Sequence, residues 1–112
     1  MVRVTILKDQ DNTCRGFETK GHAGYADQGQ DIVCAAVSVL TINTVNSLEQ
    51  FTEETFDLDA DEKSGRIAVR FTHQPDAAAA LLLSSYELGM QGIADHYGTQ
   101  YLSLEMKEVE TC

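Results

Sequence analysis

The chain has 112 residues, of which 43% are hydrophobic and 23% charged, values that exclude a disordered chain, a collagen-like fibre and a disulfide scaffold. Eighteen acidic and eight basic residues leave a net charge of −10, so a nucleic-acid-binding role is not expected. The longest apolar run, Ala77–Leu83, is far shorter than the ~20 residues of a membrane span. With no signal-peptide pattern at the start, we expect a single cytoplasmic domain over residues 1–112.

Apolar periodicity predicts seven elements. Alternation over 2–7 and 14–20 predicts a hairpin, and helical spacing over 31–51 predicts a central, buried helix that Asp31 caps. A second hairpin is expected over 56–61 and 66–71, followed by a helix from Pro75 and Asp76 to a stop at Gly98, and a strand over 102–106. The order ββαββαβ predicts an α+β fold, a two-layer sandwich with a mixed sheet and both helices on one face.

Two glycines lie inside the second predicted helix, at Gly89 and Gly92. Each costs roughly 1 kcal/mol there relative to alanine. We therefore expect both to permit a close approach between the two helices.

The segment 21–40 carries the chemistry. It places His22 in a glycine-rich loop and Cys34 in the first turn of the first helix, at its third position if Asp31 is the N-cap. A thiol there is favoured as thiolate, a nearby imidazole can take its proton, and the free N–H groups of the turn can hold an oxyanion. One histidine and one cysteine form an unspecific pattern, and a structural cysteine beside a surface histidine fits it as well.

The residues around His22 and Cys34 favour the catalytic interpretation over the structural one. Gly-His-Ala-Gly-Tyr-Ala at 21–26 and Gly-Gln-Asp-Ile-Val-Cys-Ala-Ala-Val-Ser at 29–38 closely resemble the ribosomal-processing cysteine proteases, the family called Prp. The resemblance extends to the short length, the acidic character and the order of the predicted elements.

This resemblance implies a cytosolic, homodimeric cysteine endopeptidase that needs no cofactor. The family removes an N-terminal extension, ending in two phenylalanines and an alanine, from the twenty-seventh protein of the bacterial large ribosomal subunit. By position, His22 is then the general base and Cys34 the nucleophile. A basic ribosomal precursor would also suit the acidic residues of this chain, seven of which lie between Glu49 and Glu62. Their alternative role is a solvated surface.

Further site residues have two interpretations each. Asp31 either orients His22 or caps the helix. Ser38, one turn after Cys34, either hydrogen-bonds near the sulfur or is a small core residue. Tyr25 and the loop glycines, Gly21 among them, either cover a bound apolar extension or leave an exposed aromatic.

The other cysteines and histidines are expected to be structural. An odd number of cysteines and the absence of a signal peptide argue against disulfides, and the spacing does not fit a metal site. The residues with structural expectations are Cys14, Cys112, His73 and His96.

Two other functions compete with the protease. One is a non-enzymatic acidic docking or chaperone module for a basic ribosomal protein. The other is a thiol-redox protein, which the lack of a nearby resolving cysteine disfavours.

Overall fold

The structure is a computed structural model that describes residues 1–21 and 28–110, with the side chains of residues 28–31 excepted. In chain order the elements are β1 (Val2–Lys8), β2 (Cys14–Lys20), α1 (Gln28–Phe51), β3 (Asp57–Asp61), β4 (Arg66–Arg70), α2 (Ala77–Tyr97) and β5 (Leu102–Glu108). The predicted order ββαββαβ is confirmed.

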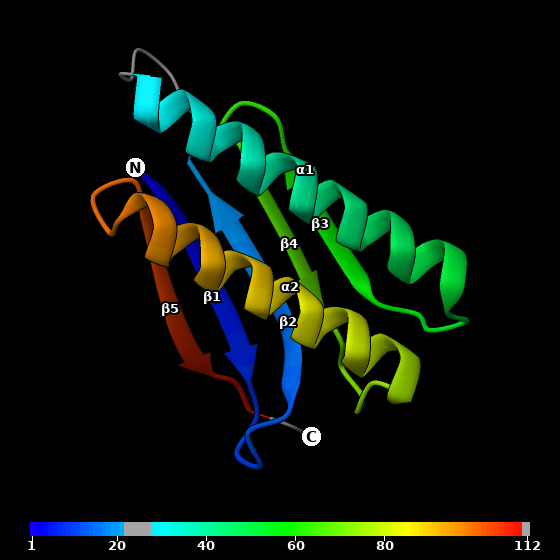
Figure 1. The fold of residues 1–112 in the computed structure, drawn as a ribbon. Coiled ribbons are helices and arrows are strands. Elements are labelled where there is room, and N and C mark those ends of the chain that lie inside the picture. The colour runs from blue at the N-terminus through cyan, green and yellow to red at the C-terminus, as the bar shows by residue number, and fades with distance from the viewer. Residues whose placement is uncertain (22–27, 111–112) are drawn as a thin grey trace.

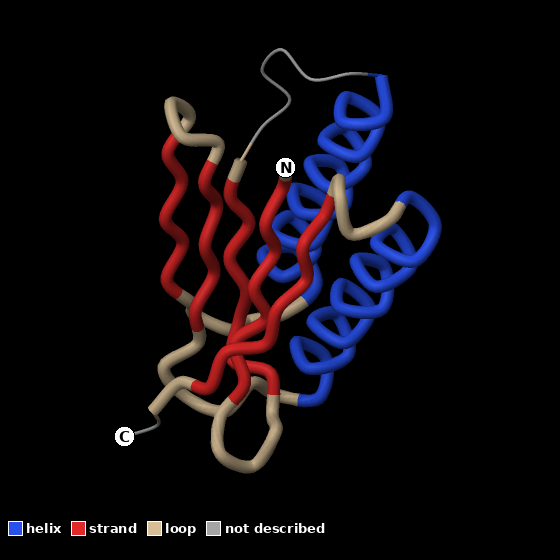
Figure 2. Tube along the Cα trace, turned by 90° about the vertical axis from the view of Figure 1, so that its left-hand side faces the viewer, coloured by secondary structure: helices blue, strands red, loops and turns tan. Residues whose placement is uncertain are grey.

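The strands form one sheet in the order β3-β4-β2-β1-β5. Neighbours pair antiparallel except β1 and β5, which run parallel with Val2 opposite Leu102. Both helices lie on the same face of this sheet, and the other face is left open (Figures 1 and 2). The predicted mixed sheet and two-layer sandwich are therefore confirmed.

The core lies between the sheet and the helices. Alternate residues of β1 (Val2, Val4 and Ile6) are almost fully buried, as period-2 alternation requires. In the middle, the rings of Phe17 on β2 and Tyr86 on α2 stack with centroids 4.0 Å apart. Residues of β2 that alternate with Phe17, such as Glu18, therefore face away from the helices.

The helices approach each other at one of the two glycines. A Cβ built on Gly89 would lie 2.6 Å from Cδ2 of Leu40 on α1, so the expectation is confirmed there. A Cβ on Gly92 would meet nothing within 4 Å, so for this residue the expectation was wrong. Gly92 lies on the solvent side of α2.

Of the two helix starts predicted from the sequence, one agrees with the structure and one does not. Asp76 caps α2 as expected, since its Oδ1 accepts a hydrogen bond from the N–H of Ala79 at 2.8 Å. Gly98, with φ +101°, ends that helix. By contrast, α1 begins at Gln28, so the prediction that Asp31 is its N-cap was wrong. An aspartate is favoured throughout the positive end of a helix, and its presence does not mark the first residue.

One helical stretch, Ile32–Phe51, is long and apolar enough to cross a membrane by length and composition. It contains polar residues, so it does not stand out as an unbroken apolar run in the sequence. The core helix of a globular protein passes the same test. Here Val33, Val37 and Leu48 belong to the hydrophobic core between the sheet and the helices. The outer side of this helix is exposed, with Val39 70% accessible, so the expectation of burial all round was wrong.

Candidate active site

Cys34 lies on α1, where it is half-buried and packs against the core. It is the seventh residue of the helix and not the third, because α1 begins earlier than predicted. At 1.5 Å per residue this is about 9 Å from the first helical residue. The effect of the helix dipole falls off within the first turn. The helix terminus therefore acts on the Cys34 thiol more weakly than the sequence indicated.

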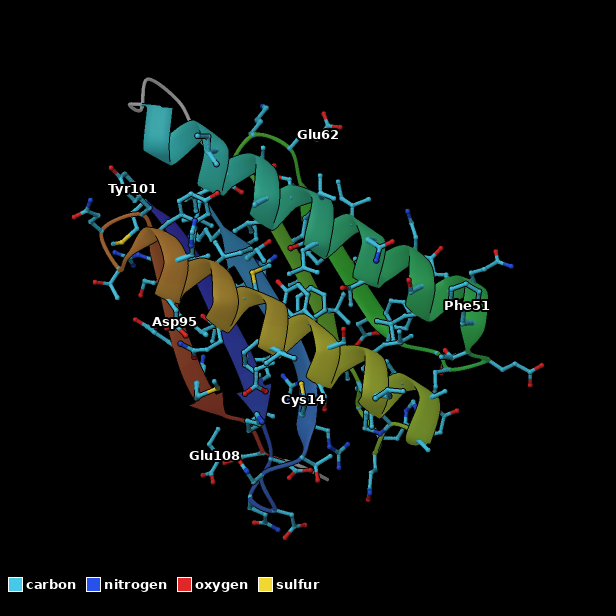
Figure 3. The ribbon with its side chains drawn as sticks, viewed as in Figure 1. Cys14, Phe51, Glu62, Asp95, Tyr101 and Glu108 are labelled. Atoms are coloured by element: carbon cyan, nitrogen blue, oxygen red, sulfur yellow. The ribbon has the colours of Figure 1, made fainter. Side chains whose placement is uncertain are left out.

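The thiol opens into a cleft of about 350 Å³ between α1 and the β3–β4 hairpin. One wall is formed by Cys34, Ser38 and Ile42, at one-turn intervals along α1. The opposite wall and the ends come from the hairpin and from the end of β2; these residues are Ala60, Asp61, Glu62, Gly65, Arg66, Ile67 and Gly21. In Figure 3, Glu62 marks the hairpin turn beside α1.

Ser38 is exposed and lines the cleft one helical turn from Cys34, so the interpretation as a small core residue was wrong. The other interpretation, a hydrogen bond near the sulfur, stays a prediction.

Gly21 has a steric reason to be glycine. Its φ of +103° is in the region that favours glycine, and a Cβ there would lie 2.7 Å from the carbonyl oxygen of Met1. Gly21 directly follows β2 and lines the cleft, so the chain that continues to His22 leaves the sheet at the site. His22 and Tyr25 themselves lie outside the described residues, as does the Asp31 side chain.

Among the described residues that line the cleft, Arg66 is the one cation, and it is already paired. Its Nε lies 3.3 Å from Oε1 of Glu18, and its Nη1 lies 2.5 Å from Oδ2 of Asp59. The hydrogen bonds to Asp59 and then to Glu18 raise the pKa of Arg66 above its ordinary value. Two acidic residues of the hairpin, Asp61 and Glu62, also line the cleft. Oδ1 of Asp61 accepts a hydrogen bond from the N–H of Lys63 at 3.0 Å.

Sequence reasoning missed the contribution of the hairpin to this cleft. The turn at 63–65 predicts the hairpin itself, but no local signal shows that it faces the first helix. That relation follows from the strand order, which places β3 and β4 at the sheet edge near α1 (Figure 1).

The remaining thiol and imidazole groups have structural surroundings. Burial raises the pKa of the Cys14 thiol, which lies 3.4 Å from the carbonyl oxygen of Gly16. His73, in the loop after β4, pairs with Glu54, and this hydrogen bond is the main cause of the lowered pKa of that carboxyl. His96 lies in the last turn of α2 against the ring of Tyr97. Cys112 lies outside the described residues.

Comparison with known proteins shows that relatives of this chain are cysteine proteases. Residues 1–102 match the family described as cysteine protease Prp. The ribosomal processing cysteine protease Prp of Staphylococcus aureus is 28% identical over 97 residues, which cover 87% of this chain and 92% of that protein. The Bacillus subtilis protein of the same name is 40% identical over 48 residues, 43% of each chain.

Solved structures share the whole fold. The S. aureus Prp in complex with a substrate peptide superposes with a TM-score of 0.88 at 26% identity, covering 96% of this chain and 100% of that one. A Streptococcus mutans protein gives a TM-score of 0.85 at 29% identity, covering 97% and 96%. Fold and cleft cysteine together define the class of a cysteine endopeptidase. The chain belongs to the cysteine protease Prp family.

Proposed function

We propose that this protein removes the N-terminal extension of a basic ribosomal protein precursor, the twenty-seventh protein of the large subunit. The observation that carries the proposal is the cleft, which Cys34 lines together with the apolar residues Ile42, Ala60 and Ile67. Such a wall suits an extension that ends in phenylalanines and an alanine. The names of the Staphylococcus and Bacillus relatives support processing of a ribosomal protein.

The reaction follows from the groups at the site. His22 takes the proton of the Cys34 thiol, and the thiolate attacks the scissile carbonyl carbon. The tetrahedral intermediate collapses to a thioester as the imidazolium donates its proton to the leaving amine. Water, deprotonated by His22, then hydrolyses the thioester and frees the thiol. An S. aureus Prp structure holds a covalently linked product peptide, which supports a covalent step.

Three further residues have proposed parts in this reaction. With the N-cap role excluded, Asp31 is assigned the orientation of His22. Ser38 contacts the bound peptide from the wall that it shares with Cys34. Tyr25 covers the bound extension from the loop that Gly21 begins.

We further propose that the enzyme works as a cytoplasmic homodimer. The outer side of α1 exposes apolar side chains at Ile32 and Val39, which are 50% and 70% accessible. Their spacing of seven residues places them on one side of the helix. A second copy of the chain would remove these side chains from water.

Two substitutions test the proposed activity. Cys34→Ala should abolish cleavage of a peptide that carries the Phe-Phe-Ala sequence. His22→Ala should lower turnover by ~10²–10⁴-fold, the contribution of a general base. Cys14→Ala, on a thiol outside the cleft, is the matched control and should retain activity. Cleavage is followed by mass spectrometry and folding by circular dichroism.

Cleavage by Cys34→Ala at the rate of the unmodified protein would overturn the assignment. If the folded, unmodified protein binds the precursor but never cleaves it, the molecule is an acidic docking module and the proposal fails.

A further inference from the structure

The strand β3 is an open sheet edge that leads into the cleft. It is the outermost strand, and all five of its residues, Asp57–Asp61, are exposed. Its last residues, Ala60 and Asp61, line the same cleft as Cys34. An extended peptide paired along this edge would therefore be delivered to the thiol. The opposite edge, β5, contributes none of the described residues that line the cleft.

The two faces of β3 differ in chemistry. Asp59 contacts Arg66, which also binds Glu18 on the open face of the sheet. Because side chains alternate along a strand, Asp57 and Asp61 share that face. Leu58, 47% accessible, and Ala60 point toward the helix layer, and Ala60 enters the cleft.

An added strand must complement both faces, because directly opposed side chains lie within contact distance. Opposite the aspartates, basic side chains are favoured and acidic ones are repelled. On the other face, apolar side chains extend the surface formed by Leu58 and Ala60. The edge is therefore suited to a segment in which basic and apolar residues alternate.

We propose that the β3 edge binds the part of the substrate that follows the scissile bond, as an additional antiparallel strand. The inference rests on the proposed function, in which a basic ribosomal protein follows an apolar extension. The antiparallel direction follows because β3 runs from Asp57 toward the cleft, while the substrate runs from the cleft outward. Main-chain hydrogen bonds supply affinity, and the alternating faces supply specificity.

The test uses the Cys34→Ala protein, so that binding is measured without cleavage. The probe is a synthetic peptide with Phe-Phe-Ala followed by alternating lysine and valine. Single N-methyl groups are placed in turn on the amides after the alanine. In an added edge strand only every second amide donates to the protein. Methylation should thus weaken binding about tenfold at alternate positions, ~1.4 kcal/mol each, and leave the positions between unaffected. An effect that is uniform, or absent, along the peptide would overturn the proposal.

A second measurement locates the edge. On peptide binding, amide hydrogen exchange should slow in β3, while the other edge strand, Leu102–Glu108, should be unchanged. Protection of β5 in place of β3 would overturn the proposal.

Charge provides a third, independent comparison. Asp57→Asn with Asp61→Asn should weaken binding of the lysine probe and not of a probe with serine in place of lysine. The matched control, Glu105→Gln on β5, should change neither. Equal losses for both probes would contradict recognition of basic residues at this edge. Cleavage of the same peptide by the unmodified enzyme tests the proposed function separately, so failure of the one is distinguishable from failure of the other.

Discussion

The two glycines of α2 make a matched pair of sites at which a single methyl group should have opposite effects. Gly89→Ala puts a Cβ 2.6 Å from Cδ2 of Leu40, whereas Gly92→Ala puts one where nothing lies within 4 Å. Both substitutions remove a glycine from the interior of the same helix. Any difference between them is therefore due to packing between α2 and α1.

The magnitudes follow from these distances. Each substitution gains ~0.8–1 kcal/mol of helix propensity. Carbon atoms pack at about 3.5–4.0 Å, so at Gly89 roughly 1 Å must be absorbed by Leu40 or by α1, and such overpacking costs ~1–3 kcal/mol. Gly92→Ala should thus stabilise the fold by about 1 kcal/mol. Gly89→Ala should be neutral or destabilise it by up to ~2 kcal/mol.

Urea denaturation followed by circular dichroism measures both variants. Leu40→Val removes the side-chain end that the new methyl group meets, so in that background Gly89→Ala should regain the stabilisation seen at Gly92. Because α1 also carries Cys34, Gly89→Ala should lower peptide cleavage while Gly92→Ala leaves it unchanged. Equal stabilisation by the two single variants would refute the reasoning.

Three further predictions concern charge and reactivity. Iodoacetamide should label Cys34 much faster than Cys14, whose pKa burial raises; equal labelling in peptide mass maps would contradict the assignment of the nucleophile. Added salt should slow cleavage of the whole precursor but not of a short neutral peptide, because the Debye length falls from ~10 Å at 0.1 M to ~3 Å at 1 M; equal salt dependence would exclude steering by the acidic residues Glu49–Glu62. The hydrogen bond from Arg15, and next that from the N–H of Thr13, lower the pKa of Asp9. This carboxylate therefore stabilises the fold above its unfolded pKa of ~3.9, and the stabilisation is lost as the pH falls through the lower pKa of the folded state. Asp9→Asn should thus make the free energy of unfolding depend less on pH in the acid range. An unchanged dependence would contradict this role of Asp9.

The elements of the fold were predictable because each has a local signature. Strand alternation at Val2, Val4 and Ile6 persists in the burial pattern of β1. Asp76 and Gly98 mark the ends of α2, since capping depends on the backbone within one turn. The start of α1 was misjudged because the preference of Asp31 for helix N-termini extends over several positions.

The candidate site was predictable only on its helix side. The motif around Cys34 lies in one continuous stretch of sequence, so its residues could be named directly. The opposite wall, with Ala60 and Ile67, reaches Cys34 through the pairing of β4 with β2. Such pairing depends on contacts between residues far apart in the chain. The exposure of Ser38 depends likewise on how the β3–β4 hairpin lies beside α1.

The parallel pairing of β1 with β5 has a consequence for the order in which the sheet is completed. β1 has β2 on one side and β5 on the other, and Val2 pairs with Leu102. During synthesis, β1 lacks this second neighbour until residues 102–108 have left the ribosome, and contacts of such sequence separation form late in folding. α2 packs against α1, β5 and β2, so its contacts with β5 are the last of these to become possible. The strand beside the N-terminal strand of the sheet is therefore added only after both helices have been made.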